Sequence, residues 1–220
     1  MKKAIFSWSG GKDSAFALSA VKKSRSYNIS ALLTTVTEGY DRVSMHGVRS
    51  QLLRAQARSL GYPLKEVLIP KRSSNRSYEA RMRKTLTGCL KTGTRSVIFG
   101  DIFLEDLKKY REEKLSELGM KAVFPIWKRD TASLAREFIY GGFKAIITCV
   151  DSDCLDKSFA GRIFDIDFLN KLPKHVDPCG ENGEFHSFVF DGPIFKNRIA
   201  FKVGDISLHS KKFYYRDLVA

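Results

Sequence analysis

From residue 3 to residue 14 the chain reads Lys-Ala-Ile-Phe-Ser-Trp-Ser-Gly-Gly-Lys-Asp-Ser. Residues 3–8 form a short run with high β propensity, and residues 15–23, just after the quoted stretch, are mostly helix formers. The glycine-rich segment between them, residues 9–14, is therefore predicted to be a turn from a strand into a helix.

The predicted turn has the composition of a phosphate-binding loop. Its two glycines let successive backbone N–H groups point at one spot, and the start of the helix adds a partial positive charge. Its serines supply hydroxyls and its lysine a formal charge. Asp13 would repel a bare phosphate, so its presence indicates Mg²⁺ between the loop and the phosphates. The candidate phosphate-binding residues are Ser9, Gly10, Gly11, Lys12, Asp13 and Ser14.

Two common nucleotide motifs are excluded for this loop. A Walker A loop would need glycine at position 6, which is Phe6, and serine or threonine at position 13, which is Asp13. The dinucleotide fingerprint G-x-G-x-x-G is also absent from the loop. The remaining alternative is a glycine-rich turn without a ligand.

Strand and helix patterns alternate through the first hundred residues. Strands are predicted at residues 29–36, 65–69 and 95–99, and helices at residues 48–60 and 78–90. This alternation predicts an α/β fold, a doubly wound parallel sheet with helices on both faces. Because ligands bind at the carboxyl ends of such strands, Thr34, Thr35, Gly100 and Asp101 are expected beside the loop at residues 9–14.

The pattern loosens after residue 100. Helices are predicted at residues 105–118 and 131–140, the second capped by Asp130, and strands at residues 122–124, 144–150, 185–190, 199–203 and 206–208. We therefore expect a nucleotide-binding domain at residues 1–100 and a smaller substrate-side α/β module at residues 101–220.

Charge and composition restrict the class of protein. Lys and Arg outnumber Asp and Glu by 38 to 24, and the net charge of +14 favours anionic partners such as nucleotides, RNA or acidic proteins. Hydrophobic residues make up 43% of the chain, which allows a sizeable core. No apolar run is long enough to cross a bilayer, and no signal peptide is evident, so we expect a cytoplasmic protein without membrane contact.

The four cysteines give no clear metal or disulfide pattern. None belongs to a Cys-x-x-Cys motif, so buried, unreactive thiols are expected. A metal site built from Cys149, Cys154, Cys179 and a histidine is a weaker alternative, because the spacing matches no zinc template.

Further motifs extend along most of the chain. They are His46 after a long loop, the helix at residues 51–61 with its Gly-Tyr-Pro end, and residues 99–102, 125–127, 141–145, 161–165, 177–185 and 191–193. The loop at residues 9–14 resembles the PP-loop of the N-type ATP pyrophosphatases. The whole set resembles the diphthine–ammonia ligases, also called the ATP-binding domain 4 family, within that superfamily.

The resemblance implies an enzyme that uses ATP and Mg²⁺ to adenylate a carboxylate, releases pyrophosphate and lets ammonia displace AMP. In that family the acceptor is diphthine, a modified histidine of translation elongation factor 2. The resemblance assigns the ATP site to Ser9, Gly10, Gly11, Lys12, Asp13, Ser14, Thr34, Thr35, Gly100 and Asp101, with Asp13 as the metal ligand. It assigns catalysis to Lys12, Asp13, Glu181 and Glu184, and it makes Trp127 a candidate for contacting the trimethylammonium group of diphthine.

The acceptor-side segment departs from the family pattern. Established ligases read closer to Gly-Glu-Gly-Gly-Glu-Phe-Glu-Thr, whereas this chain has Asn182 in place of a glycine and His186-Ser187 in place of the last pair. The acceptor is therefore open between diphthine and another carboxylate or amide, and the nitrogen donor in the cell and the oligomeric state, for which a homodimer is one option, are also open. Two other functions compete: a PP-loop enzyme that modifies tRNA, and an ATP-binding regulator without turnover.

Overall fold

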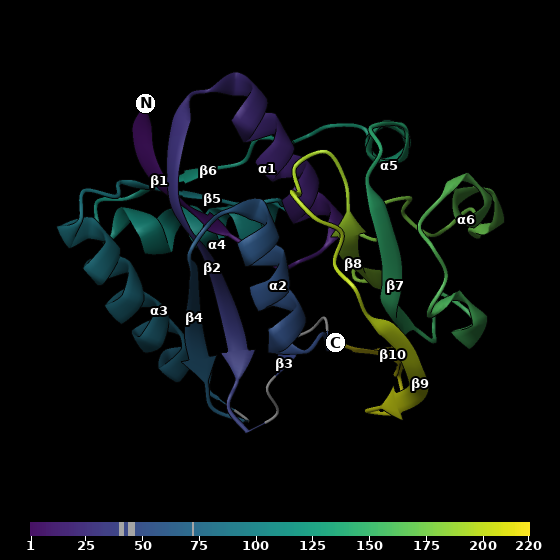
Figure 1. Ribbon diagram of the computed structural model, residues 1–220. Coiled ribbons are helices and arrows are strands. Elements are labelled where there is room, and N and C mark those ends of the chain that lie inside the picture. The colour runs from purple at the N-terminus through teal and green to yellow at the C-terminus, as the bar shows by residue number, and fades with distance from the viewer. Residues whose placement is uncertain (40–41, 44–46, 72) are drawn as a thin grey trace.

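The computed structural model describes residues 1–39, 42–43, 47–71 and 73–220, and it contains two sheets of different kinds (Figure 1). Five parallel strands form the N-terminal sheet in the order β4-β2-β1-β5-β6. A short strand, β3 (Arg42–Val43), pairs antiparallel with the end of β2. The five parallel strands are β1 (Lys2–Ser7), β2 (Tyr27–Thr37), β4 (Leu64–Ile69), β5 (Ser96–Ile98) and β6 (Lys121–Val123).

Helices cover both faces of the parallel sheet. Ile5 and Phe6 are neighbours in β1, so their side chains point to opposite faces, and they belong to different hydrophobic clusters. Phe6 shares its cluster with residues of α1 (Lys12–Ser24) and α2 (Ser50–Leu60). Ile5 shares its cluster with residues of α3 (Asn75–Lys91) and α4 (Glu105–Ser116). The predicted doubly wound α/β sheet is confirmed, and its strand order reverses between β1 and β5.

The C-terminal sheet is antiparallel, in the order β8-β7-β10-β9. Before it, α5 (Thr131–Tyr140) begins at Asp130, whose carboxylate accepts a bond from the Ser133 N–H, so the predicted cap is confirmed. The other elements are β7 (Lys144–Asp151), β8 (Phe185–Asp191), β9 (Lys202–His209), β10 (Phe213–Val219), the 3₁₀ turn η1 (Lys157–Phe159) and α6 (Ile166–Lys171).

The last part of the chain differs from the prediction. One strand, β9, replaces the two strands expected at residues 199–203 and 206–208, and β10 was not predicted. The pairing of β9 with β10 shifts register between Arg216 and Leu218, and this irregularity interrupts the alternation on which a strand prediction depends. Most of β9 is exposed, so burial leaves little signal there.

The two sheets are joined through a shared core and through polar contacts. Buried residues of both parts, including Leu18 of α1 and Phe188 of β8, belong to one hydrophobic cluster. Asp217 of β10 forms ion pairs with Arg42 at 2.8 Å and Arg49 at 2.6 Å. Within the described ranges, no helix is long and apolar enough to span a membrane.

Candidate functional site

The loop at residues 9–14 lies at the carboxyl end of β1, where the strand order reverses, and Gln56 of α2 fixes its path. Gln56 is fully buried; its Oε1 accepts a bond from Trp8 Nε1 at 2.9 Å. Its Nε2 donates to the carbonyls of Gly10 at 3.0 Å and Val189 at 2.6 Å. Gly10 has φ of 81°, and a Cβ on it would lie 2.8 Å from Gln56 Oε1, so the site requires glycine.

Hydrogen bonds to its own serine hydroxyls hold the conformation of the loop. The Ser9 hydroxyl accepts from the Gly11 N–H at 3.2 Å and donates to the Ser14 hydroxyl at 3.1 Å. The Ser14 hydroxyl in turn donates to the Gly11 carbonyl at 2.9 Å, and the Lys12 N–H donates to the Ser187 hydroxyl of β8 at 3.1 Å. The predicted turn from a strand into a helix is therefore present, and β8 lies against it. The N–H groups of Gly11 and Lys12 are bonded to protein hydroxyls.

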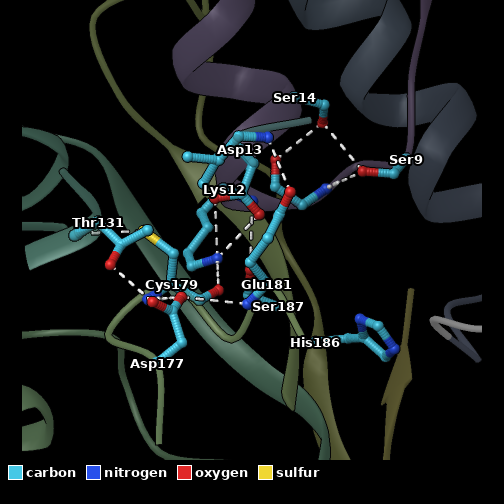
Figure 2. A network of polar contacts seen from close by, with 12 residues as sticks. Ser9, Lys12, Asp13, Ser14, Thr131, Asp177, Cys179, Glu181, His186 and Ser187 are labelled. Carbon is cyan, nitrogen blue, oxygen red and sulfur yellow. Dashed lines mark hydrogen bonds and ion pairs between the residues drawn. The ribbon is translucent and has the colours of Figure 1, made fainter. Parts of the chain in front are cut away.

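The ammonium group of Lys12 is already bonded to other protein groups and does not stand free over the loop for a phosphate. Its Nζ donates to both carboxylate oxygens of Asp13, at 2.9 and 2.8 Å, and to the carbonyl of Cys179, as Figure 2 shows. Burial opposes the charge of this lysine, but Asp13 together with Cys179 and Glu181 favours the charge, and the pKa of Lys12 is raised. Burial also raises the pKa of Asp13, in spite of the lysine. Lys12 thus connects the loop to the segment around Cys179.

A cavity of about 380 Å³ opens beside the loop, between the sheet and the helices α3 and α4. Thr34 and Thr35, at the end of β2, line it, as the sequence predicts, together with Ser9. Its remaining wall is largely apolar and aromatic, with Tyr78, Met82, Leu86, Phe99, Leu115 and Leu118 among the lining residues. The size and lining suit a planar, mainly apolar group such as a nucleoside.

A second cavity of about 270 Å³ lies over the loop itself; we call it the acidic cavity for its carboxylates, although Lys12 and Arg111 also line it. Three carboxylates line it: Asp13, Asp101 after β5, and Glu181 from the segment before β8. Gly100 also lines it, and a Cβ on Gly100 would lie 2.9 Å from the backbone of Asp13 and Ser14. The structure therefore brings the N-terminal loop, the end of β5 and the acceptor-side segment together.

The two glutamates of the acceptor-side segment lie in different places. Glu181 accepts from the backbone N–H of Ile102 at 2.7 Å and lines the acidic cavity. Burial raises the pKa of Glu181 to about 7, against the bond from Ile102, which favours the charged form. Glu184 is buried and accepts from the N–H groups of Asp177 and Asn182, both at 3.0 Å. Glu184 therefore shapes its own loop and does not line either cavity in the described part of the chain.

His186 and Ser187, where the sequence departs from the family pattern, both line the acidic cavity. Ser187 holds the Lys12 N–H, whereas His186 lies apart from the network around Lys12 (Figure 2). Burial, followed by the charge of Lys12, lowers the pKa of His186 to about 4. The histidine is therefore neutral at physiological pH.

Two other residues from the sequence motifs, Trp127 and His46, remain to be located. Trp127 does not line either cavity within the described ranges, and the ammonium group of Lys108 lies 4.9 Å from its ring centroid. His46 lies outside the described residues. Sequence reasoning missed Gln56, whose polar side chain on an amphipathic helix resembles a surface residue until its burial is known.

The four cysteines are free thiols, and Cys154 is the one that is only partly buried. Burial raises the pKa of each, that of Cys149 to about 12. In the described ranges no three His, Cys, Asp or Glu residues form a group that could hold a metal, so the alternative cysteine site is not formed.

The acidic cavity nevertheless fits a magnesium ion held jointly with phosphates. Asp13 and Asp101 line the same cavity, and Asp101 Oδ2 is buried without a hydrogen-bond partner among the described residues. Mg²⁺ is commonly held by one or two carboxylates with the remaining positions taken by phosphate oxygens and water. These residues match that donor set.

A doubly wound parallel sheet with a Ser-Gly-Gly-Lys-Asp-Ser loop at its switch point defines an α/β protein of the PP-loop class. The family model described as the diphthamide synthase N-terminal domain matches residues 1–122, and the one described as the diphthamide synthase C-terminal domain matches residues 130–217. The chain belongs to the diphthamide synthase family.

Curated relatives carry the name diphthine–ammonia ligase. The chain is 31% identical to the one from Danio rerio over 113 residues, which are 49% of this chain and 44% of the relative. It is 30% identical to the Homo sapiens protein over 115 residues, 49% of this chain and 42% of the relative. It is 31% identical to the Schizosaccharomyces pombe protein over 103 residues, which are 45% of this chain and 17% of the relative. The matches thus span less than half the length of these relatives.

Proposed function

We propose that this protein is an ATP-dependent, AMP-forming ligase that adenylates a carboxylate and amidates it with ammonia, and that it acts in diphthamide synthesis. The observation that carries the proposal is the junction of three parts at one place. The PP-loop, a nucleoside-sized cavity and a glutamate with a pKa near 7 adjoin at the switch point of the sheet. The relatives named diphthine–ammonia ligase support the acceptor class.

In the proposed complex the nucleoside lies in the larger cavity, beside Thr34 and Thr35. The β- and γ-phosphates lie over the loop, where backbone N–H groups and the N-terminus of α1 favour anions. Asp13 and Asp101 would hold Mg²⁺, which when bound neutralises charge on the phosphates. Lys12 holds the acceptor-side segment through Cys179 and keeps Asp13 in place before ATP arrives.

The proposed reaction has two steps. An oxygen of the acceptor carboxylate attacks the α-phosphorus, and the bond to the α,β-bridging oxygen breaks as pyrophosphate leaves. Ammonia then attacks the acyl carbon, the bond to the AMP oxygen breaks, and the nitrogen gives up a proton. We propose that Glu181 takes that proton, because it lines the cavity over the loop and burial raises its pKa to about 7. We propose a positioning role for Glu184, since it holds the loop that carries Glu181.

A division of the chain into an ATP-binding part and an acceptor-side part also belongs to this proposal. The expected boundary near residue 100 stays a prediction. The pairing of β6 with β5 favours a division after residue 123, because residues 121–123 then remain with the parallel sheet.

The test follows the α-phosphate of ATP. Purified protein is incubated with ATP labelled at that phosphate, ammonium, Mg²⁺ and elongation factor 2 that carries diphthine. We expect labelled AMP and, by mass spectrometry, replacement of the acceptor hydroxyl by an amino group. Asp13→Asn should abolish both, whereas Asp106→Asn should not, because Asp106 occupies the same first-turn position in α4 away from the cavities.

Other products would contradict the proposal. Labelled ADP would exclude adenylation. AMP that depends on added tRNA and not on the translation factor would indicate RNA modification. ATP binding without any Asp13-dependent product would indicate a regulator.

A further inference from the structure

The two cavities share part of their walls, and this junction contains a charged side chain that the proposed reaction has not yet used. Among the described lining residues, Arg111 is the one ionisable residue that belongs to both cavities. The other shared residues are Ser7, Ser9, Phe99 and Leu107. Arg111 therefore stands between the nucleoside-sized space and the space over the PP-loop.

Arg111 is held in a fixed orientation on two sides. Its guanidinium carbon lies 4.2 Å from the centroid of the Phe99 ring, and its Nη2 donates to Asp101 Oδ1 at 3.1 Å. The side chains of Arg111 and Asp101 are 26% and 13% exposed. A stacked guanidinium that is anchored by one hydrogen bond loses little further freedom when it binds an anion.

Some of the polar atoms of this pair remain unused. Arg111 Nε and Asp101 Oδ2 are both buried without a hydrogen-bond partner among the described residues. Such atoms are uncommon in folded proteins and call for an explanation in each case. A phosphate oxygen at the junction would satisfy the arginine, whose planar fork matches phosphate geometry.

The position of the junction selects one phosphate. If the nucleoside occupies the larger cavity and the β- and γ-phosphates occupy the loop, the α-phosphate falls between them, beside Arg111. We propose that Arg111 binds the α-phosphate of ATP and of the adenylate, and that Asp101 is the positioning residue for its guanidinium. This inference rests on the proposed function.

The assignment has a chemical consequence for adenylation. As the carboxylate oxygen bonds to the α-phosphorus and the pyrophosphate oxygen departs with its electron pair, negative charge spreads over the non-bridging oxygens. A guanidinium already in place stabilises that charge without reorganisation. The same contact would hold AMP until ammonia displaces it from the acyl carbon.

The experiment tests the parts of ATP as separate ligands. Binding of adenosine, AMP and pyrophosphate is measured by calorimetry for the wild type, Arg111→Met and Lys109→Met. We expect Arg111→Met to weaken AMP by about 10- to 100-fold while adenosine and pyrophosphate change by less than about two-fold. Lys109→Met removes the same charge from α4 outside both cavities and should leave all three ligands unchanged.

A second variant protects the test against misfolding. Arg111→Lys keeps a positive charge beside Asp101, and it should weaken AMP less than Arg111→Met does while adenosine and pyrophosphate again stay unchanged. Equal weakening of adenosine and AMP, or unchanged AMP affinity, would overturn the role of Arg111. If wild-type protein makes AMP from ATP while either of those results is obtained, only this inference fails. If wild-type protein binds none of the three ligands, the proposed function fails and takes the inference with it.

Discussion

Gln56 illustrates how much one buried side chain does for the candidate site, because it links Trp8, Gly10 and Val189. We expect Gln56→Leu, which keeps the volume, to lower the free energy of unfolding by about 2–4 kcal/mol, since it leaves three polar groups unsatisfied. Urea denaturation measures this, and Gln51→Leu on the exposed face of α2 should change stability by less than about 0.5 kcal/mol. Equal effects of both changes would contradict the role of Gln56.

Glu181 gives the proposed reaction a pH dependence. Its folded-state pKa of about 7 means that the base form appears as pH rises through neutrality. At a constant concentration of unprotonated ammonia, the rate of amide formation should therefore rise about tenfold per pH unit below 7 and level off above it. Glu181→Gln keeps an acceptor for the Ile102 N–H, but it should lower the rate by about 10²- to 10⁴-fold and remove this rise. A variant with the wild-type pH profile would exclude Glu181 as the base.

The functional role of residues that are contiguous in sequence could be predicted. The role of residues whose position depends on tertiary contacts could not. Residues 9–14 form a contiguous stretch with a recognisable composition, and they lie at the expected turn from β1 into α1. The N–H groups of Gly11 and Lys12, which were expected to point at a phosphate, donate to the hydroxyls of Ser9 and Ser187. Arg111 is one of several cations on a charged helix, and its position depends on which face of α4 meets Phe99. Glu184 matches its motif by sequence, yet the turn at Asp177 and Asn182 directs it inward.

At the scale of elements, the start of α1 packs closely against Gly100, which follows β5. A methyl group at Gly100 would meet the backbone of Asp13 and Ser14, which cannot move without shifting the loop. We expect Gly100→Ala to abolish detectable ATP binding and to destabilise the fold by about 1–3 kcal/mol. Gly88→Ala in α3, where a Cβ meets nothing within 4 Å, should be neutral or stabilise by up to about 1 kcal/mol. Calorimetry and thermal unfolding of both variants test this, and full ATP affinity in Gly100→Ala would contradict it.

β10 is tied to the parallel sheet by Asp217. The hydrogen bond from Arg49, followed by that from Arg42, holds the pKa of Asp217 well below its usual range. A lowered folded-state pKa stabilises the protein above the unfolded value of about 4, and the benefit declines as pH falls below it. Asp217→Asn should therefore cost about 1–2 kcal/mol at pH 7, given the partial exposure of the pair, and less at pH 3. Urea titrations at both values, with exposed Asp205→Asn as the control, measure the difference; a cost independent of pH would contradict it.

The strands of the C-terminal sheet also show which elements the sequence could locate and which it could not. The largely buried strands β1 and β7 could be located from apolar runs, whereas β9 is mostly exposed and β10 contains Arg216 and Asp217. Asp217 pairs with Arg49, far away in sequence, and Arg216 donates to Gly204 of the neighbouring strand, so periodicity alone could not place these charged residues in a strand.

At the scale of the whole molecule, the two sheets share one hydrophobic cluster. We therefore expect a single cooperative thermal transition in which far-UV and near-UV circular dichroism change together. Two separated transitions would show that the parallel and antiparallel parts unfold independently. The sequence did not predict this continuity, because it depends on Phe188 and Leu218 packing with residues more than a hundred positions away.

The buried cysteines have a practical consequence. Thiolates, not thiols, react with maleimides and disulfide reagents, and Cys89, Cys149 and Cys179 are buried, with pKa values raised by burial. Cys154, whose pKa is also raised, is only partly buried. A cysteine introduced at Tyr140, which is 75% exposed, would therefore be the preferred site of attachment. A fluorophore or spin label could then be placed after replacement of Cys154 alone, with the three buried cysteines left in place.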